Sequence, residues 1–219
     1  MKELNKIVIF DLDGTLADSI DDLVLSANET RKVFNLPPLS KKIISSFVGD
    51  GLNLFVERLF KDSDIGIEEA IKTFKEKYST HLTDNTKFYP GTTECIRKLR
   101  KNGFVTGILS NKKEKLSKLL VENLGFSHLF DFIYGGDSFE EKKPSPLPIL
   151  KILEKFDGDK ANSFMVGDSC NDVLSGNKAG IKTIEVIYGF NKDIHLKNCK
   201  ADFTAEKPAD ICKIILEKQ

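Results

Sequence analysis

The chain alternates between short apolar runs and longer segments in which apolar residues recur at helical spacing. Five short runs, several of them rich in β-branched residues, cover residues 7–10, 104–109, 132–134, 164–166 and 183–187. The helical spacing is found in the intervening segments 92–102, 112–124, 146–156 and 171–179. Strands that are apolar throughout and alternate with helices predict an α/β fold, with a doubly wound, Rossmann-like parallel sheet covered by helices on both faces.

The segment from residue 16 to residue 86 interrupts this alternation. It contains no comparable strand run, and its apolar residues recur at helical spacing, as in Leu52, Phe55, Val56 and Leu59. We therefore expect residues 16–86 to form a small all-helical cap domain inserted after the first strand. Residues 1–15 and 87–219 are then the α/β core domain.

Composition limits the partners and the location of this 219-residue chain. Lys and Arg together number 33, as do Asp and Glu, so the formal net charge is zero and predicts no general attraction to nucleic acid or to an anionic membrane. No apolar run is long enough to span a bilayer, and the amino terminus lacks a signal-peptide cleavage site. These features predict a cytoplasmic protein. We expect a monomer or a homodimer, and the sequence does not distinguish the two.

The cysteines are widely scattered along the chain: Cys95, Cys170, Cys199 and Cys212. Their spacing fits neither a zinc site nor a disulfide framework. We therefore expect reduced thiols, as in other cytoplasmic proteins.

Residues suited to chemistry directly follow the first predicted strand, in the sequence Asp11-Leu12-Asp13-Gly14-Thr15. A carboxylate such as Asp11 can attack phosphorus to give an acyl phosphate. Asp13 can protonate the leaving oxygen and later activate water. Gly14 lets the backbone approach a bound phosphate. A turn or a helix cap uses the same residue types and is the alternative interpretation.

Two further segments carry groups that suit a phosphate. Ser110 and Asn111 follow the second strand, where a hydroxyl and backbone amides at a helix start form an anion site. An ordinary N-cap is the alternative there. Lys143 lies in the proline-containing segment 140–146 and can offer a fixed ammonium group, although a solvated surface loop has the same composition.

The fourth segment, residues 167–172, places Asp168 directly after another strand and Asp172 at the start of the next helix. Magnesium prefers hard oxygen ligands, and one or two carboxylates with substrate phosphate suffice. Asp168 fits a direct ligand, whereas Asp172 fits either a metal-bound water or an orienting partner for Lys143. Helix capping is the alternative. Because the ends of parallel strands converge, the four segments together predict one site that transfers a phosphoryl group with Mg²⁺.

The order of these motifs resembles that of the haloacid dehalogenase superfamily of hydrolases. The resemblance runs from about residue 7 to the carboxyl terminus, with the helical insert where that superfamily's first cap type belongs. The closest likeness is to the phosphoglycolate phosphatase-like branch, carried by Phe47-Val48-Gly49-Asp50-Gly51, by Gly135-Gly136-Asp137 and by residues 142–146.

The resemblance implies a role for each motif residue. It implies Asp11 as the nucleophile and Asp13 as the general acid and base. Phosphate would contact three side chains, namely those of Ser110, Asn111 and Lys143. Mg²⁺ would be held by Asp11, the backbone carbonyl of Asp13 and Asp168, with Asp172 in support.

Alternatives within the superfamily differ at single positions. Dehalogenases lack the second aspartate, whereas Asp13 is present here. The β-phosphoglucomutases carry a histidine where this chain has Leu23. A phosphatase acting on a small phosphorylated metabolite therefore remains the leading hypothesis. A phosphomutase, a pyrophosphatase, a nucleotidase and a non-catalytic phosphate-binding protein remain open.

Substrate choice is expected to lie in the cap, which closes over the site and excludes water. Gly49, Asp50 and Gly51 form the candidate specificity loop, although a plain helix–helix turn is an equal alternative. Arg58 on the following helix suits a substrate carboxylate, but a solvated helix face is the favoured interpretation.

Overall fold

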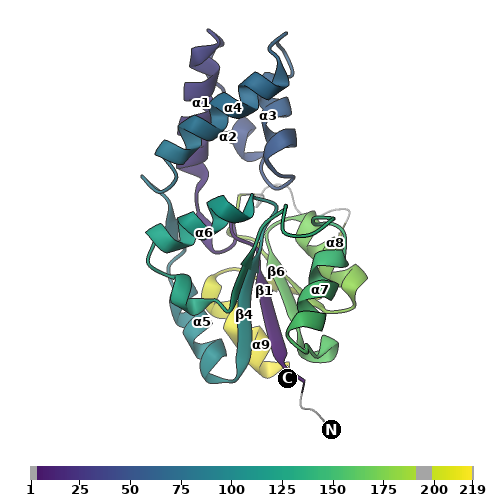
Figure 1. Cartoon of the computed structure of the whole chain (residues 1–219). Coiled ribbons are helices and arrows are strands. Elements are labelled where there is room, and N and C mark those ends of the chain that lie inside the picture. The colour runs from purple at the N-terminus through teal and green to yellow at the C-terminus, as the bar shows by residue number, and fades with distance from the viewer. Residues whose placement is uncertain (1–3, 191–198, 219) are drawn as a thin grey trace.

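The computed structural model describes residues 4–190 and 199–218 and contains a six-stranded parallel sheet (Figure 1). The strand order is β5-β4-β1-β6-β7-β8. The strands are β1 (Lys6–Phe10), β4 (Phe104–Leu109), β5 (Phe132–Tyr134), β6 (Phe164–Gly167), β7 (Lys182–Val186) and β8 (Phe203–Ala205). The predicted α/β class is confirmed, and the five predicted strands agree with the observed ones to within a residue or so.

Helices cover both faces of the sheet because successive strand residues point to opposite sides. Ile7 and Ile9 pack on one face with helices α7 (Leu147–Lys155) and α8 (Cys170–Ala179). Val8 and Phe10 pack on the other. The helices on that face are α5 (Thr92–Lys101), α6 (Glu114–Asn123) and α9 (Pro208–Glu217). Short 3₁₀ turns, η1 (Ser127–Leu129) and η2 (Lys160–Asn162), precede β5 and β6. The sequence pattern did not predict β8 or α9.

Four further helices gather at the carboxyl end of β1, away from the amino terminus of the chain (Figure 1). They are α1 (Ile20–Val33), α2 (Lys41–Ser45), α3 (Leu52–Phe60) and α4 (Ile67–Thr80). The chain enters and leaves them through an antiparallel ribbon of β2 (Ala17–Asp18) and β3 (Lys87–Phe88). This segment is helical, as predicted, apart from the short β2. Its assignment as a separate cap domain, residues 16–86, stays a prediction.

Asp22 joins α1 to the segment that leads out of the helices. Its side chain is fully buried and accepts hydrogen bonds from the backbone N–H groups of Asn85 and Thr86, from the Asn85 amide and from the Thr86 hydroxyl, all at 2.7–3.0 Å. Burial alone would raise the pKa of Asp22, but these donors outweigh it and hold the pKa below its ordinary value. The ionised carboxylate therefore fixes the position of α1 relative to the ribbon.

Asp22→Ala should lower the free energy of unfolding by about 2–4 kcal/mol at pH 7, because four donors, two of them on the buried Thr86, lose their buried charged acceptor. Since the folded pKa is depressed, this contribution is present above the unfolded pKa and disappears as the pH falls through the folded pKa. Urea unfolding of both proteins at pH 7 and pH 3 measures it. Asp21→Ala is the matched control, because Asp21 is 61% exposed and its ion pair is with Lys41 alone. An equal effect of both substitutions would contradict this role of Asp22.

The expectation of four reduced cysteines is wrong for two of them. Cys170 and Cys199 form a disulfide, whereas Cys95 and Cys212 are free and buried. The pair is 29 residues apart in sequence. The fold brings the two together because the chain after β7 returns along α8, where the Asn177 amide donates to the Lys200 carbonyl. Spacing alone did not indicate this return.

Candidate active site

The predicted site residues converge at the carboxyl ends of the three central strands. Asp11 follows β1, Ser110 follows β4 and Asp168 follows β6, and these strands are neighbours in the sheet. A pocket opens there between the sheet and helices α1, α3 and α4, with a cavity volume of about 70 Å³. Asp11, Asp13, Ser110, Asn111 and Lys143 line its inner end.

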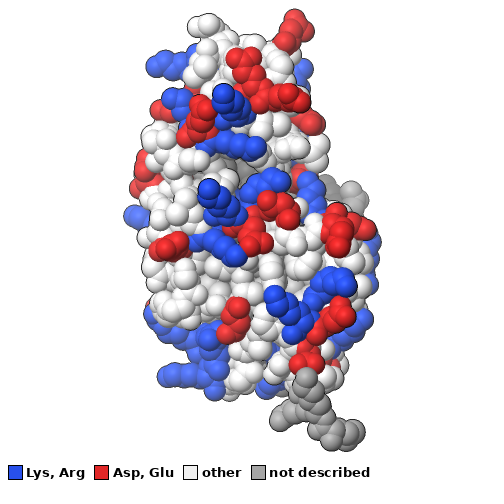
Figure 2. Space-filling model, in the orientation of Figure 1, with Lys and Arg blue, Asp and Glu red and all other residues white. Residues whose placement is uncertain are grey.

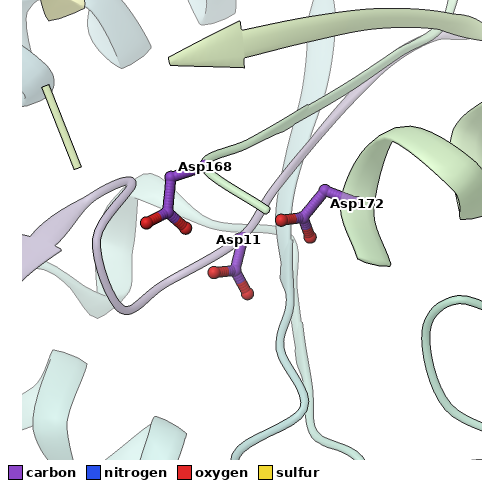
Figure 3. Close-up of side chains that lie close together, drawn as sticks. All are labelled: Asp11, Asp168 and Asp172. Atoms are coloured by element: carbon purple, nitrogen blue, oxygen red, sulfur yellow. The ribbon is translucent and has the colours of Figure 1, made fainter. Parts of the chain in front are cut away.

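Three carboxylates meet beside the pocket (Figure 3). One oxygen each from Asp11, Asp168 and Asp172 lies within 4.8 Å of the others, and all three residues are buried. Burial is the largest cause that raises the pKa of Asp11, to about 6, with the charges of Asp172 and Asp13 adding to it and Lys143 opposing it. Burial, then Asp11 and Asp172, likewise raise the pKa of Asp168. The cluster therefore concentrates negative charge that a positive group must offset.

Lys143 supplies part of that positive charge. Its side chain is 2% exposed, and its Nζ lies 2.7 Å from Asp11 Oδ1 and 2.6 Å from Asp172 Oδ1. Burial by itself would lower the pKa of Lys143, but Asp11 and Asp172 raise it above its ordinary value. Lys143 is thus a fixed ammonium group, and the surface-loop interpretation does not describe its side chain.

Asp172 has partners for both of its oxygens. Besides Lys143 at Oδ1, its Oδ2 accepts hydrogen bonds from the Ser169 hydroxyl at 2.6 Å and from the Ser169 backbone N–H at 3.1 Å. These bonds close the first turn of α8 and direct Oδ1 at the lysine. This geometry favours Asp172 as the group that orients Lys143.

The Asp168 carboxylate packs against the backbone of two glycines, Gly14 and Gly189, which leave room for it. Gly14 has φ +86°, and a Cβ built there would lie 2.3 Å from Asp168 Oδ2. A Cβ at Gly189 would lie 2.7 Å from the same oxygen. The Phe190 N–H donates to Oδ2 at 3.0 Å. Any side chain at Gly14 would therefore displace Asp168 from the cluster.

The donor set fits a hard divalent cation. All of its candidate ligand atoms are oxygens, which such ions prefer. When ionised, the carboxylates of Asp11 and Asp168 together carry more negative charge than the single ammonium group of Lys143 neutralises. Burial and the neighbouring carboxylates raise the pKa values of both Asp11 and Asp168. A bound cation would oppose this effect, because it favours the ionised forms of both carboxylates. This acidic cluster is therefore the candidate metal centre.

Asp13 lies on the side of the pocket that faces the helices. Its Oδ1 accepts hydrogen bonds from the Ser19 hydroxyl at 2.5 Å and from Lys112 Nζ at 2.7 Å. Lys112 Nζ is in turn 2.6 Å from the hydroxyl of Tyr78. Sequence reasoning assigned no role to Ser19, Tyr78 or the side chain of Lys112. The position of Lys112 directly after Ser110 and Asn111 is the signal that could have indicated it.

Ser110 and Asn111 are both buried at the end of β4. The Ser110 hydroxyl accepts from the Lys112 backbone N–H at 3.3 Å and lies at the pocket wall. The Asn111 amide donates to the carbonyls of Gly49 at 2.8 Å and Lys143 at 3.0 Å. The Asn111 amide therefore connects the helical insert to the segment that carries Lys143, and its contact with a phosphate stays a prediction.

Residues 49–51 contact the core through several hydrogen bonds. Asn171 donates from Nδ2 to Asp50 Oδ1 at 2.8 Å and to the Gly49 carbonyl at 3.2 Å, and Lys142 Nζ reaches the Asp50 carbonyl at 2.6 Å. Gly49 and Gly51 line the pocket. Arg58 does not belong to the lining: it donates to Asp50 Oδ2 at 2.5 Å and to the Phe47 carbonyl at 3.1 Å.

The surface view shows basic and acidic side chains interspersed over this face of the molecule, with no extended area of one sign (Figure 2). Among the described residues, no helix combines the length and the apolar character needed to cross a bilayer.

Known proteins are similar to this chain in sequence and in fold. Residues 8–186 match the family model for haloacid dehalogenase-like hydrolases. The phosphoglycolate phosphatase of Aquifex aeolicus is 36% identical, with 96% of each chain covered. That of Chromobacterium violaceum is 41% identical over 84% of this chain and 86% of its own. The crystal structure of a predicted phosphoglycolate phosphatase from Haemophilus somnus superposes with a TM-score of 0.92 at 30% identity and covers 98% of this chain and 99% of its own. The chain therefore belongs to the haloacid dehalogenase-like hydrolases and is a phosphatase.

Proposed function

We propose that the chain hydrolyses a small phosphomonoester with Mg²⁺ through a covalent aspartyl-phosphate on Asp11. The observation that carries this proposal is the buried contact of Asp11 with Lys143 beside Asp168. It joins a nucleophile, a fixed cation and a metal ligand in one place. Phosphoglycolate is the first substrate to test, because similar proteins are phosphoglycolate phosphatases.

Asp11, Asp168 and the backbone carbonyl of Asp13 would hold the cation. When bound, Mg²⁺ offsets the repulsion between the Asp11 carboxylate and a phosphate dianion. Asp172 would act through Lys143, since both of its oxygens already accept hydrogen bonds.

Asp11 is then placed to attack phosphorus, while Lys143 Nζ donates a hydrogen bond of 2.7 Å to its Oδ1. Lys143, the Ser110 hydroxyl and backbone amides near Gly14 would stabilise the equatorial oxygens, because catalysis of phosphoryl transfer is mostly positioning and charge stabilisation. Asp13 would give a proton to the leaving oxygen and afterwards take one from the water that hydrolyses the acyl phosphate. Ser19 and Lys112 fix Asp13 for both steps.

The helical insert would limit the size of the leaving group. Its side of the pocket presents Leu23, Val48, Leu52, Phe55 and Phe74. A cavity of about 70 Å³ has room for roughly five water molecules. It therefore suits a leaving group of only a few atoms better than it suits a nucleotide. Leu23, at the position where a mutase carries histidine, offers no group for proton transfer.

Release of inorganic phosphate tests this function. With phosphoglycolate and Mg²⁺ the purified protein should reach a kcat/KM of at least about 10⁴ M⁻¹s⁻¹. An excess of EDTA should abolish the activity, and added Mg²⁺ should restore it. Pyrophosphate, a nucleoside monophosphate and a sugar phosphate complete the substrate panel. Undiminished hydrolysis in EDTA, or phosphate transfer between sugar positions without release, would contradict the proposal.

Mg²⁺ should also stabilise the fold, and more so at pH 7.5 than at pH 5. When the pKa of an acid is higher in the folded than in the unfolded protein, the free energy of unfolding falls as the pH rises between the two pKa values. The pKa of Asp11 rises from 3.8 to about 6, and that of Asp168 shifts in the same direction. The metal-free protein is therefore penalised at neutral pH, where the ionised carboxylates also bind the cation best.

At 100 times its dissociation constant, Mg²⁺ should raise the free energy of unfolding by about 2.7 kcal/mol. For a chain of this size that corresponds to a rise of roughly 5–10 °C in Tm. Thermal melts at both pH values measure the shift, with NaCl at matched ionic strength as the control. Asp168→Asn should lose the shift while keeping a folded, metal-free protein of equal or higher Tm. An unchanged shift in that variant would rule out Asp168 as a ligand.

A further inference from the structure

Lys112 and Tyr78 form a polar contact inside the pocket that the mechanism above uses only in part. The Lys112 side chain is 9% exposed, and its Nζ lies 2.7 Å from Asp13 Oδ1 and 2.6 Å from the Tyr78 hydroxyl. Lys112 belongs to the core, directly after β4, whereas Tyr78 lies on α4 and is almost fully buried. This contact therefore links the acid/base to the helices above it.

Both groups keep their protons at neutral pH. Burial alone would lower the pKa of Lys112, but Asp13 and Tyr78 raise it above its ordinary value. Burial raises the pKa of Tyr78 to about 12. The pocket therefore offers one ammonium group and one hydroxyl beside Asp13, and both can donate hydrogen bonds to an anion.

The other lysines in the described pocket lining, Lys113 and Lys143, have acidic partners elsewhere. The remaining side chains that line the pocket from the helical insert are apolar: Leu23, Val48, Leu52, Phe55 and Phe74. Lys143 contacts Asp11 and Asp172, and Lys113 is exposed near Asp137. Arg58, the residue that sequence reasoning suggested for a substrate carboxylate, is paired with Asp50 outside the lining.

We propose that Lys112 Nζ and the Tyr78 hydroxyl bind a carboxylate carried on the carbon next to the leaving oxygen, and that this pair determines substrate specificity. The assignment rests on the proposed function, because that function places the leaving oxygen at Asp13. A carboxylate on the adjacent carbon puts its oxygens roughly 3 Å from the leaving oxygen. At that distance they reach Lys112 Nζ while it still contacts Asp13.

Two consequences follow from the position of the pair. Core and insert each supply one donor, so a bound carboxylate favours the arrangement in which α4 covers the strand ends. A leaving group with a neutral hydroxyl in place of the carboxylate leaves the buried ammonium group without that partner and meets apolar side chains beyond it. Discrimination by buried polar groups of this kind exceeds what an apolar pocket achieves by shape.

Two substrates of equal length separate recognition from chemistry. They are phosphoglycolate and 2-hydroxyethyl phosphate, in which a neutral hydroxymethyl group replaces the carboxylate. The wild-type protein should prefer phosphoglycolate in kcat/KM by about 100-fold or more. Lys112→Met should lower that preference by about 10- to 100-fold, mainly through KM for phosphoglycolate. Tyr78→Phe, which removes one hydroxyl, should lower it by about 5- to 10-fold. Lys118→Met on α6 is the control, since Lys118 is exposed and pairs with Glu114.

A binding measurement gives a readout that does not depend on turnover. In the Asp11→Asn background, Lys112→Met should weaken calorimetric binding of phosphoglycolate by about 10- to 100-fold and leave binding of 2-hydroxyethyl phosphate within about threefold. Equal losses for both ligands would overturn the proposal, because Lys112 would then act only through Asp13. A wild-type protein without preference would overturn it as well. Failure of the proposed function shows differently, as no hydrolysis of either ester by the wild-type protein with Mg²⁺.

Should Lys112→Met fail to fold, as judged by circular dichroism, Tyr78→Phe decides alone, because an unchanged preference in that variant overturns the assignment.

Discussion

Asp11→Asn should reduce phosphate release by roughly 10⁴-fold or more, since loss of a catalytic nucleophile removes the covalent route altogether. The amide keeps the shape of the side chain but cannot attack phosphorus. It also removes one buried negative charge from a cluster in which the pKa of Asp11 is already raised to about 6. The variant should therefore be as stable as the wild-type protein at pH 7.5 or more so. Steady-state kinetics with phosphoglycolate and a thermal melt measure both effects.

Asp18→Asn is the matched control for this substitution. Asp18 lies on β2, a few residues along the chain, and its side chain is exposed. That variant should keep the activity and the Tm of the wild-type protein. If Asp11→Asn kept more than a small fraction of wild-type turnover, another residue would have to be the nucleophile.

Lys143→Met should lower kcat/KM by about 10²–10³-fold, the usual cost of removing one group that stabilises transition-state charge. It should also destabilise the protein, because Asp11 and Asp172 lose the ammonium group that lies within 2.7 Å of both. Without Lys143 the pKa of Asp11 rises further, since the lysine lowers it. The loss of stability should therefore be greater at pH 8 than at pH 5.

Kinetics and thermal melts at the two pH values test these expectations. Lys151→Met on α7 is the control, because Lys151 is a surface residue paired with Glu154. Lys143→Arg should not restore activity, since a planar guanidinium group cannot replace a compact ammonium group between two carboxylates. Full activity of Lys143→Met would show that the ammonium group is not needed for phosphoryl transfer.

Much of the fold could be predicted from the sequence because parallel strands buried on both faces are apolar throughout. The runs at 104–109 and 132–134 coincide with β4 and β5. Short strands at the sheet edge carry less signal: β8 has three residues, of which Ala205 alone is fully buried. The disulfide between Cys170 and Cys199 depends on the path of the chain after β7, which no local pattern encodes.

The site was predictable where a residue directly follows a strand. Strand ends in a parallel sheet converge, so Asp11, Ser110 and Asp168 could be placed together before the structure was known. Contacts between the helical insert and the core were not predictable, because they depend on how segments far apart in the sequence meet. The contact of Lys112 with Tyr78 could not be predicted for that reason.

The covalent aspartyl-phosphate is the central feature of the proposed mechanism. Rapid quenching of the Asp13→Asn variant during reaction with p-nitrophenyl phosphate and Mg²⁺ should trap it, because p-nitrophenolate leaves without a proton from Asp13, whereas the variant still lacks the base that activates water for hydrolysis of the acyl phosphate. Mass spectrometry of the digested protein should then find one phosphoryl group, on the peptide that contains Asp11. A wild-type protein that turns over phosphoglycolate while neither it nor the variant ever carries phosphate on Asp11 would contradict the proposed mechanism.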